Sequence, residues 1–519
     1  MHVAGLRRNQ TNDIDVRPLR IILQSLPVLT SVRCDEDTID ILPDEILLTI
    51  FYFCVDDSGW SESSVVTYFH RHASQRLGID AWQSLVHVCR RWRSVVFGSP
   101  HSLNLRLVCT SRTPAKSTLA VWPALRLLIQ DRNVCCSERV HHIPMGRSVD
   151  NIISLLEHCD RVDKIELLGV DSSQLGDILA AMQEPFPGLT DLHLHSFQVD
   201  ETVQVVPNSF LGGCASRLQS LWLDGIPFPG LPKLLLSTTQ LVHLFLENTP
   251  HSGYISPEEM TSSLATLINL GSLGLEFQSP LSRPHWASRP PPPPTRSVLP
   301  ALTNFCFKGA SEYLDDLVAH IDSPKLNNLN ITFFNDIVFD TPQFIQFINR
   351  TPTFKQLEKA QAFFATGAGN IKFSSQTPGY YGKINVEIRC RALDWQVSSL
   401  EQVCTSCLPP LSMLENLYID EDPYLPSDWG DNIETTQWLE ILRPFTSAKN
   451  LYLSERFARR IVPALQGLNG GETTEVLPNV RNIFLKELQP SGPVWEGIRQ
   501  FVSARQVAHR PILVPLAHW

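Results

Sequence analysis

One spacing pattern recurs ten times along this 519-residue chain: an apolar residue is followed three and five positions later by two more. The copies begin at Val162, Leu189, Leu218, Leu241, Leu270, Leu302, Leu326, Leu414, Ala448 and Val480. Most of them lie 23 to 34 residues apart. Apolar alternation with a period of two predicts one β-strand per copy. Repeated units of this length bury their apolar faces by stacking on their neighbours rather than around one common core.

The stretches between the copies complete each repeating unit. Gln174–Met182 and Leu314–Ile321 carry apolar residues at helical spacing, which predicts a helix or turn after each strand. An asparagine often stands directly before the middle apolar residue, as at Asn304, Asn328, Asn416, Asn450 and Asn482. The pattern resembles a degenerate leucine-rich repeat. This resemblance implies an α/β solenoid of parallel strands, each followed by a helix or turn.

Two helices are expected ahead of the repeats. Proline, acidic residues and then an apolar face predict the first helix over Asp40–Val55. Apolar residues at helical spacing predict the second from about Trp82 to Phe97. Alternating leucines over Leu103–Leu107 then predict the first strand of the repeat region.

The two helical segments carry sequence motifs of a known module. Leu42–Leu47 reads LPDEIL, and Leu85–Arg93 reads LVHVCRRWR. Together they resemble the F-box, most of all that of fungal F-box proteins, a short helical module that docks to the SKP-type adaptor of cullin-RING ubiquitin ligases. By position, the resemblance implies that the module core and its adaptor-binding surface consist of Leu42, Pro43, Ile46, Leu47, Val88, Cys89 and Trp92. The alternative is that these helices only cap the end of the solenoid.

The patterns divide the chain into three parts. We expect a loose arm at 1–37, a helical F-box-like module at 38–100 with an insertion at about 56–81, and the solenoid at 101–519 with a proline-rich loop at about 279–296. The segment between the two motifs is thereby longer than in a compact F-box, which would weaken or reshape adaptor docking. Within the solenoid, Phe354–Tyr381 looks irregular. The alternation over Ile384–Ile388 predicts one extra strand in the long gap between copies.

The repeats also predict a candidate binding face. When the apolar residues of a strand point inward, the residues between them point to the opposite face of the sheet. The central outward positions are Glu166, His193, Trp222, Phe245, Gly274, Cys306, Asn330, Tyr418, Tyr452 and Phe484. Large aromatic residues anchor many protein interfaces. The candidate target-binding residues are therefore His193, Trp222, Phe245, Tyr418, Tyr452 and Phe484, unless inserted loops fold over the rings and make them part of the core.

Composition and motifs exclude other classes of function. The net charge of −10 gives no support for general nucleic-acid binding. No stretch is long and apolar enough for a membrane span, and twelve scattered cysteines suit a reducing compartment, so we expect a soluble cytoplasmic or nuclear protein. Cys404 and Cys407 have the spacing of half a zinc site without a second half. Common nucleophile, phosphate-binding and metalloprotease motifs are absent, and we predict no catalytic residue, metal or cofactor.

The resemblance implies a non-enzymatic role. We expect a substrate-recognition subunit of an SCF-type ubiquitin ligase, in which the F-box binds a SKP-type adaptor and through it a cullin, while the repeats bind a target protein. No nucleic acid or membrane partner is expected. The alternative is a leucine-rich-repeat scaffold or regulatory binding protein with no role in a ligase.

Overall fold

The computed structural model describes fourteen segments of the chain. These are residues 42–55, 85–99, 102–103, 105–121, 125–132, 149–197, 204–279, 295–334, 341–375, 382–407, 411–425, 433–468, 475–486 and 491–515. The chain divides into two compact units, Met1–Trp60 with Ala81–Asn104, and Ser61–Asp80 with Leu105–Trp519. The expected arm at 1–37, the insertion at 56–81 and nearly all of the proline-rich loop lie outside the described residues.

The first unit is built on two packed helices. Helix α2 (Asp44–Val55) confirms the first expected helix, and α5 (Arg90–Gly98) packs against it. The Phe51 and Trp92 rings form the contact between them, with centroids 4.7 Å apart. The Arg91 guanidinium donates to the Asp44 carboxylate at 2.8 Å and to the Leu42 carbonyl, and so ties α5 to the start of α2.

The second expected helix is not continuous, so that prediction was wrong. Leu85 and Val86 are helical, a turn follows, and α5 starts afresh at Arg90. Cys89 is extended (φ −153°, ψ 172°), and its thiol accepts a hydrogen bond from the Trp92 backbone N–H at 3.4 Å. Cys89 is therefore the N-cap of α5. The apolar periodicity continues across this break, so the spacing of apolar residues in the sequence does not reveal it.

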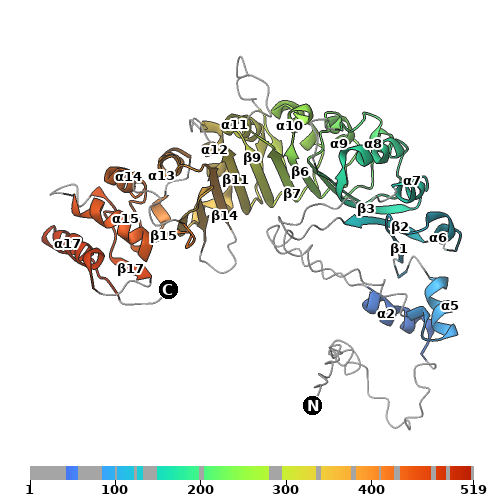
Figure 1. The fold of residues 1–519 in the computed structure, drawn as a ribbon, viewed down its shortest axis with the longest axis horizontal. Coiled ribbons are helices and arrows are strands. Elements are labelled where there is room, and N and C mark those ends of the chain that lie inside the picture. Colours follow the sequence, from blue (N-terminus) through green and yellow to red (C-terminus); the bar gives the residue numbers. More distant parts are fainter. Residues whose placement is uncertain are drawn as a thin grey trace, which may run out of the picture. The chain divides into compact units, whose positions relative to one another are not determined.

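The second unit is organised around one long sheet (Figure 1). Among the described residues this sheet has 15 strands, in the order β1-β2-β3-β4-β5-β6-β7-β9-β11-β14-β13-β12-β15-β16-β17. Their bounds are β1 Arg106–Cys109, β2 Arg126–Arg132, β3 Val162–Asp171, β4 Asp191–Phe197, β5 Ser220–Asp224, β6 His243–Thr249, β7 Ser272–Phe277, β9 Asn304–Gly309, β11 Asn328–Phe334, β14 Lys383–Arg389, β13 Gly369–Ser374, β12 Lys359–Phe364, β15 Asn416–Glu421, β16 Asn450–Ser454 and β17 Asn482–Lys486. A separate pair joins β8 (Ser297–Val298) to β10 (Ile321–Asp322).

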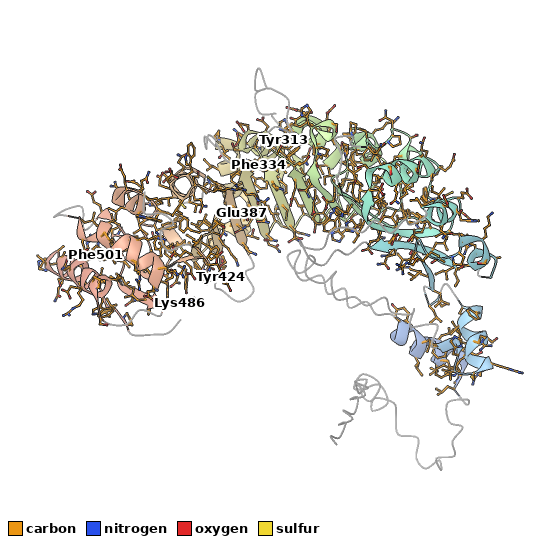
Figure 2. The ribbon with its side chains drawn as sticks, viewed as in Figure 1. Tyr313, Phe334, Glu387, Tyr424, Lys486 and Phe501 are labelled. Carbon is orange, nitrogen blue, oxygen red and sulfur yellow. The ribbon has the colours of Figure 1, made fainter. Side chains whose placement is uncertain are left out.

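Helices lie along one side of this sheet (Figure 1). They are α6 Ala115–Val121, α7 Asp150–Leu156, α8 Ser172–Ala181, α9 Leu231–Leu235, α10 Pro257–Leu264, α11 Ser311–Ala319, α12 Pro342–Arg350, α13 Leu393–Gln402, α14 Thr435–Glu440, α15 Glu455–Gln466 and α17 Pro493–Val507. Tyr313 of α11 shows how this layer joins the strands (Figure 2). It is buried, its ring packs on Phe277 of β7 at 4.8 Å, and its hydroxyl donates to the Ile255 carbonyl at 3.0 Å.

The repeat pattern accounts for the core between the two layers. The first, fourth and sixth residues of every copy are buried, with the single exception of Leu485 in the last copy. The strand and helix of each unit therefore follow from the pattern, and the helices expected at Gln174–Met182 and Leu314–Ile321 are confirmed as α8 and α11.

One irregular region was predicted wrongly. Phe354–Tyr381 contains β12 and β13, which pair with each other in antiparallel register. The expected extra strand exists as β14, parallel to β11 and antiparallel to β13. The hairpin therefore inserts two further strands between β14 and β15 and makes the sheet locally mixed. Its inward positions include the small residues Ala360 and Ala362, which weaken the apolar signal of β12.

The recurring asparagines form hydrogen-bonded ladders across the strands. The side-chain amide of Asn450 donates to the Asn416 side-chain oxygen at 2.8 Å, and that of Asn482 donates to Asn450 at 2.7 Å. Asn328 donates to Asn304 in the same way at 3.3 Å. Each ladder holds neighbouring repeats in register, which gives the asparagines of the pattern a structural role.

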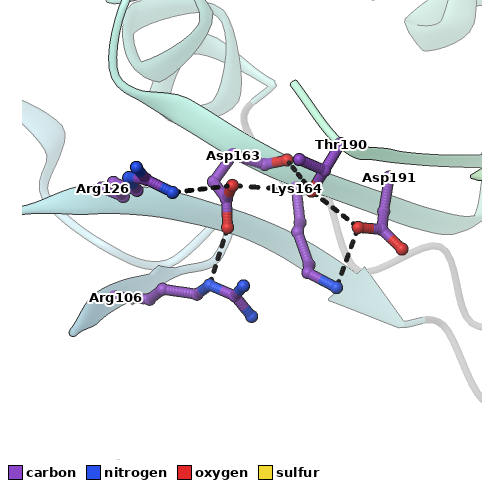
Figure 3. A network of polar contacts seen from close by, with 6 residues as sticks. All are labelled: Arg106, Arg126, Asp163, Lys164, Thr190 and Asp191. Atoms are coloured by element: carbon purple, nitrogen blue, oxygen red, sulfur yellow. Dashed lines mark hydrogen bonds and ion pairs between the residues drawn. The ribbon is translucent and has the colours of Figure 1, made fainter. Parts of the chain in front are cut away.

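A polar network ties the first strands together (Figure 3). Asp163 is the extra residue of a bulge in β3, because Val162 pairs with Leu127 and Lys164 pairs with Leu128. The buried Asp163 carboxylate lies 2.7 Å from the Arg106 guanidinium of β1 and 3.6 Å from that of Arg126 of β2. One carboxylate thereby links three adjacent strands.

Candidate binding surfaces

The central outward-facing residues of the strands form one continuous row. Strand pairing places in it Glu166, His193, Trp222, Phe245, Gly274, Cys306, Asn330, Asn385, Lys372, Gln361, Tyr418, Tyr452 and Phe484. All ten expected outward positions belong to this row. The six candidate target-binding residues fall into two groups at a distance from each other, because six strands separate Phe245 from Tyr418. Their role in binding a target stays a prediction.

The first group, which we call the N-terminal ladder, is a stack of three rings that is largely shielded from solvent. It consists of His193, Trp222 and Phe245. Successive ring centroids are 4.7 Å apart, with interplanar angles of 23° and 29°. Trp222 and Phe245 are only 8% and 7% exposed. Most of both rings is therefore covered within the protein, as expected for core residues, and His193 is the half-buried end of the stack.

Gly274 makes room for this stack. A Cβ atom at Gly274 would lie 2.4 Å from Cδ1 of Phe245, closer than van der Waals contact allows. We expect Gly274→Ala to displace the Phe245 ring and to lower the free energy of unfolding by about 1–2 kcal/mol. The matched control is Gly271→Ala, where the nearest atom is 3.7 Å away and the change should stay within about 0.5 kcal/mol. Urea unfolding of both variants measures the difference, and equal midpoints would contradict the expectation.

The second group, the C-terminal ladder, consists of Tyr418, Tyr452 and Phe484. Their rings are stacked at 4.1 Å and 4.5 Å, with interplanar angles of 6° and 8°. All three are half-buried, so each keeps part of its ring open to solvent. Burial and the neighbouring Tyr452 hydroxyl raise the pKa of Tyr418 to about 12. The ammonium of Lys359 lies 4.0 Å from the Tyr418 ring centroid, a cation–π contact at the inner end of the ladder.

Acidic side chains gather beside the N-terminal ladder. Asp224, Glu247 and Glu276 lie on the adjacent strands β5, β6 and β7. Burial, together with the charges of Glu276 and Asp224, raises the pKa of Glu247 to about 8. The Lys308 ammonium lies 3.9 Å from Glu276 and donates to Asn248 at 3.2 Å. This cluster holds a proton on Glu247 at neutral pH.

Three lysines occupy the next part of the same face. Lys359, Lys372 and Lys383 lie on β12, β13 and β14 and are half-buried. Burial and the charge of Lys372 lower the pKa of Lys359 and of Lys383. We call these three residues the lysine patch. Sequence reasoning did not find it, because two of its strands were not predicted.

The seven residues expected in the F-box-like module differ in their environments. Leu47 is buried, and Leu42, Cys89 and Trp92 are half-buried, with Trp92 packed on Phe51. Pro43 is exposed, and Ile46 and Val88 keep 47% and 58% of their surface exposed. The helix pair therefore has a core and also leaves apolar side chains open to solvent. Their contact with an adaptor stays a prediction.

Comparison with known families decides what this module is. Residues 30–124 match the family described as F-box-like domain. This part of the chain is an F-box-like domain. The match covers α2, α5, β1 and α6, and so extends past the two sequence motifs into the first strand of the sheet. No curated protein sequence matches the chain significantly.

Solved structures with some likeness are remote. The leucine-rich repeat-containing protein LegL7 from Legionella pneumophila is 12% identical, with 65% of this chain and 96% of that chain covered and a TM-score of 0.25. A chain from the structure of the Rad7 and Elc1 complex in yeast is 13% identical, with 81% of this chain and 90% of that chain covered and a TM-score of 0.24. The leucine-rich-repeat-like character of the second unit follows from its own strand order and burial pattern.

In the described part of the F-box-like domain, one more large apolar side chain is exposed besides those of Ile46 and Val88. Tyr52 of α2 is 44% exposed, and it lies outside the LPDEIL motif. Its position after the buried Phe51 on an amphipathic helix is the signal that would have found it. In the described part of the chain, no three histidine, cysteine or acidic residues are grouped to hold a metal ion, and no helix there is long and apolar enough to cross a membrane.

Proposed function

We propose that this protein is a substrate-recognition subunit of an SCF-type cullin-RING ubiquitin ligase. The match of residues 30–124 to the F-box-like domain carries the proposal. In this role, the module at 38–100 docks to a SKP-type adaptor and through it to a cullin, and the solenoid at 101–519 binds a target protein. The role implies an intracellular protein with no chemistry of its own.

Adaptor docking would use the exposed apolar residues of the F-box-like domain. Ile46, Val88 and Tyr52 are each about half exposed, and burying the remaining apolar surface at an interface is favourable by about 1 kcal/mol each. Trp92 would act indirectly, because its ring packs on Phe51 and so holds α5 against α2, and the buried Leu47 would belong to the core of the first unit. Some of the seven predicted residues would thus contact the adaptor, and others would stabilise the module that presents them.

The protein would promote ubiquitin transfer only by holding the target close to the ligase. A target held on the repeats and an adaptor held by the F-box-like domain belong to one assembly, so ubiquitin transfer to the target becomes nearly intramolecular. The C-terminal ladder is the better candidate for contact with a target, since its three rings remain half-open while Trp222 and Phe245 are buried.

The test is capture of a purified SKP-type adaptor by the full-length protein. We expect the double substitution Ile46→Glu with Val88→Glu to weaken capture at least about tenfold, because it places charges where apolar burial is needed. Both side chains are exposed, so the variant should fold. A matched control is Leu236→Glu with Ile268→Glu, which changes two residues of the second unit that are 57% and 60% exposed. This control should retain capture.

Two outcomes would contradict the proposal. If the wild-type protein captures no SKP-type adaptor, the alternative of a repeat scaffold or regulatory binding protein with no role in a ligase gains support. If the Ile46 and Val88 variant binds as well as the wild type, the adaptor contacts another surface. Circular dichroism of both variants verifies that each keeps its helical content.

A further inference from the structure

The lysine patch is compact because of strand register. Lys359 of β12 and Lys383 of β14 both lie opposite Ser374 of β13. Their α-carbons are therefore about 10 Å apart, since neighbouring strands are spaced by about 4.8 Å. Lys372 lies on β13 two residues from Ser374, on the same face. The three lysines thus stand on one face of three adjacent strands.

These lysines have no carboxylate partner among the described residues. Other lysines of the sheet are paired, as Lys164 is with Asp191 at 2.8 Å and Lys308 is with Glu276 at 3.9 Å. The nearby Glu387 carboxylate is already paired with Arg389 at 3.0 Å (Figure 2 labels Glu387). Burial and mutual repulsion lower the pKa of Lys359 and Lys383. The fold therefore holds like charges together at a cost that a bound anion would offset.

An aromatic surface and an amide adjoin the patch. Lys359 lies over Tyr418, the first ring of the C-terminal ladder. Gln361 stands in the central row between Lys372 and Tyr418 and makes no side-chain hydrogen bond to the described residues. A ligand on this face would meet cations, then an amide able to bond a peptide backbone, then the exposed parts of stacked rings.

The charges around the patch limit what can bind. Asp224 and Glu276 lie on the same face of the sheet on one side of the patch, and Asp420 of β15 lies on it on the other side. A long polyanion lying across the strands would run into these acids, and the net charge of −10 opposes one in general. A short segment that alternates carboxylates with an apolar residue fits the available area, because extended peptides place alternate side chains about 7 Å apart on one face.

We propose that the lysine patch and the C-terminal ladder together bind an extended acidic peptide segment of the target protein, rich in aspartate or glutamate and carrying a large apolar residue. The three lysines receive the carboxylates, and the apolar residue packs against Tyr418 and its neighbours. This inference rests on the proposed function for its partner, a target protein, while its chemistry depends only on the sheet.

The first experiment measures binding of a fluorescent peptide to the full-length protein. The probe alternates glutamate with serine around a central phenylalanine, and its counterpart has glutamine in place of every glutamate. We expect the acidic probe to bind at least tenfold more tightly than the counterpart. We also expect its affinity to fall as salt is raised, because the attraction is largely between charges.

Variants locate the site. Lys359→Gln, Lys372→Gln and Lys383→Gln combined should weaken binding of the acidic probe at least tenfold. A matched control changes Lys116, Lys233 and Lys325 to glutamine, three exposed lysines outside this face, and should bind like the wild type. Removing like charges should leave thermal stability unchanged or raised. If the triple variant does not fold, Lys372→Gln alone repeats the test and should weaken binding at least threefold.

The results separate this inference from the proposed function. Equal binding of both probes, or equal binding by the patch variant and its control, would overturn the inference, even if the SKP-type adaptor is still captured. Tighter binding of a single-stranded oligonucleotide, lost in the same variant, would overturn it in favour of a nucleic-acid site. Patch-dependent binding of the acidic probe without adaptor capture would support the inference for the sheet and count against the ligase role alone.

Discussion

Replacing Asp163 by alanine should lower the free energy of unfolding of the second unit by about 2–3 kcal/mol. Its carboxylate is buried and is shared by Arg106 and Arg126, whose side chains are 29% and 41% exposed. Losing one partner of a buried pair costs about 3–5 kcal/mol, and the partial exposure of both arginines reduces this, because water can solvate them once the carboxylate is gone.

The position of Asp163 predicts where the damage occurs. The bulge residue joins β1, β2 and β3, and repeats at the end of a solenoid contact only one neighbour, so the first strands should open before the rest. Hydrogen exchange should therefore accelerate in β1 and β2 and stay unchanged from β5 onward.

The control is Asp191→Ala in the same network. It removes the 2.8 Å ion pair between Lys164 and Asp191, whose side chains are 24% and 35% exposed. It should cost less than about 1 kcal/mol. Equal losses in the two variants would contradict this explanation.

The architecture of the second unit could be predicted because its inward positions are large and regular. Leucine, isoleucine or phenylalanine fills nearly every inward position of the ten copies, and burial of such residues is what a strand of this kind requires. The asparagines before the middle residue were visible in the sequence, yet their ladders were not. A side-chain bond between strands depends on register, which a single copy does not encode.

Other features could not be predicted because their sequence signals are local or weak. The thiol of Cys89 caps α5 within an apolar period that continues through the break, so spacing alone predicted one helix. Strand β12 has alanine at two inward positions, and the hairpin it forms reverses direction inside an otherwise parallel sheet. Without that hairpin, Lys359 and Lys372 could not be assigned to a face.

The candidate target-binding residues show the same limit. Alternation placed His193, Trp222 and Phe245 on the outward face correctly, since face depends only on the period of two. Exposure depends on neighbouring strands as well. Trp222 and Phe245 stack on each other, and Gly274 gives space to Phe245, so two outward rings are buried.

Glu247 should make the stability of the second unit fall as pH rises. Its pKa is raised to about 8, first by burial and then by the charges of Glu276 and Asp224. A carboxyl group with a raised pKa in the folded state keeps its proton after the unfolded chain has lost its own. Its contribution to stability is therefore fully present below about pH 4.5, the ordinary value, and is lost as pH rises through about 8. At about 1.4 kcal/mol per pH unit, the decline between pH 5 and pH 7 amounts to about 3 kcal/mol.

The substitution Glu247→Gln isolates this effect. Glutamine has the shape of the protonated carboxyl group and does not ionise, so the variant should lose this part of the pH dependence. It should equal the wild type near pH 4.5 and exceed it by about 3 kcal/mol at pH 7. Urea unfolding at a series of pH values measures both curves. Glu276, whose pKa is also raised, contributes a slope of the same sign in both proteins, and the difference between the curves removes most of it. Parallel curves would mean that Glu247 ionises normally in the folded protein, and the acidic cluster would then carry one more negative charge beside the lysine patch at neutral pH.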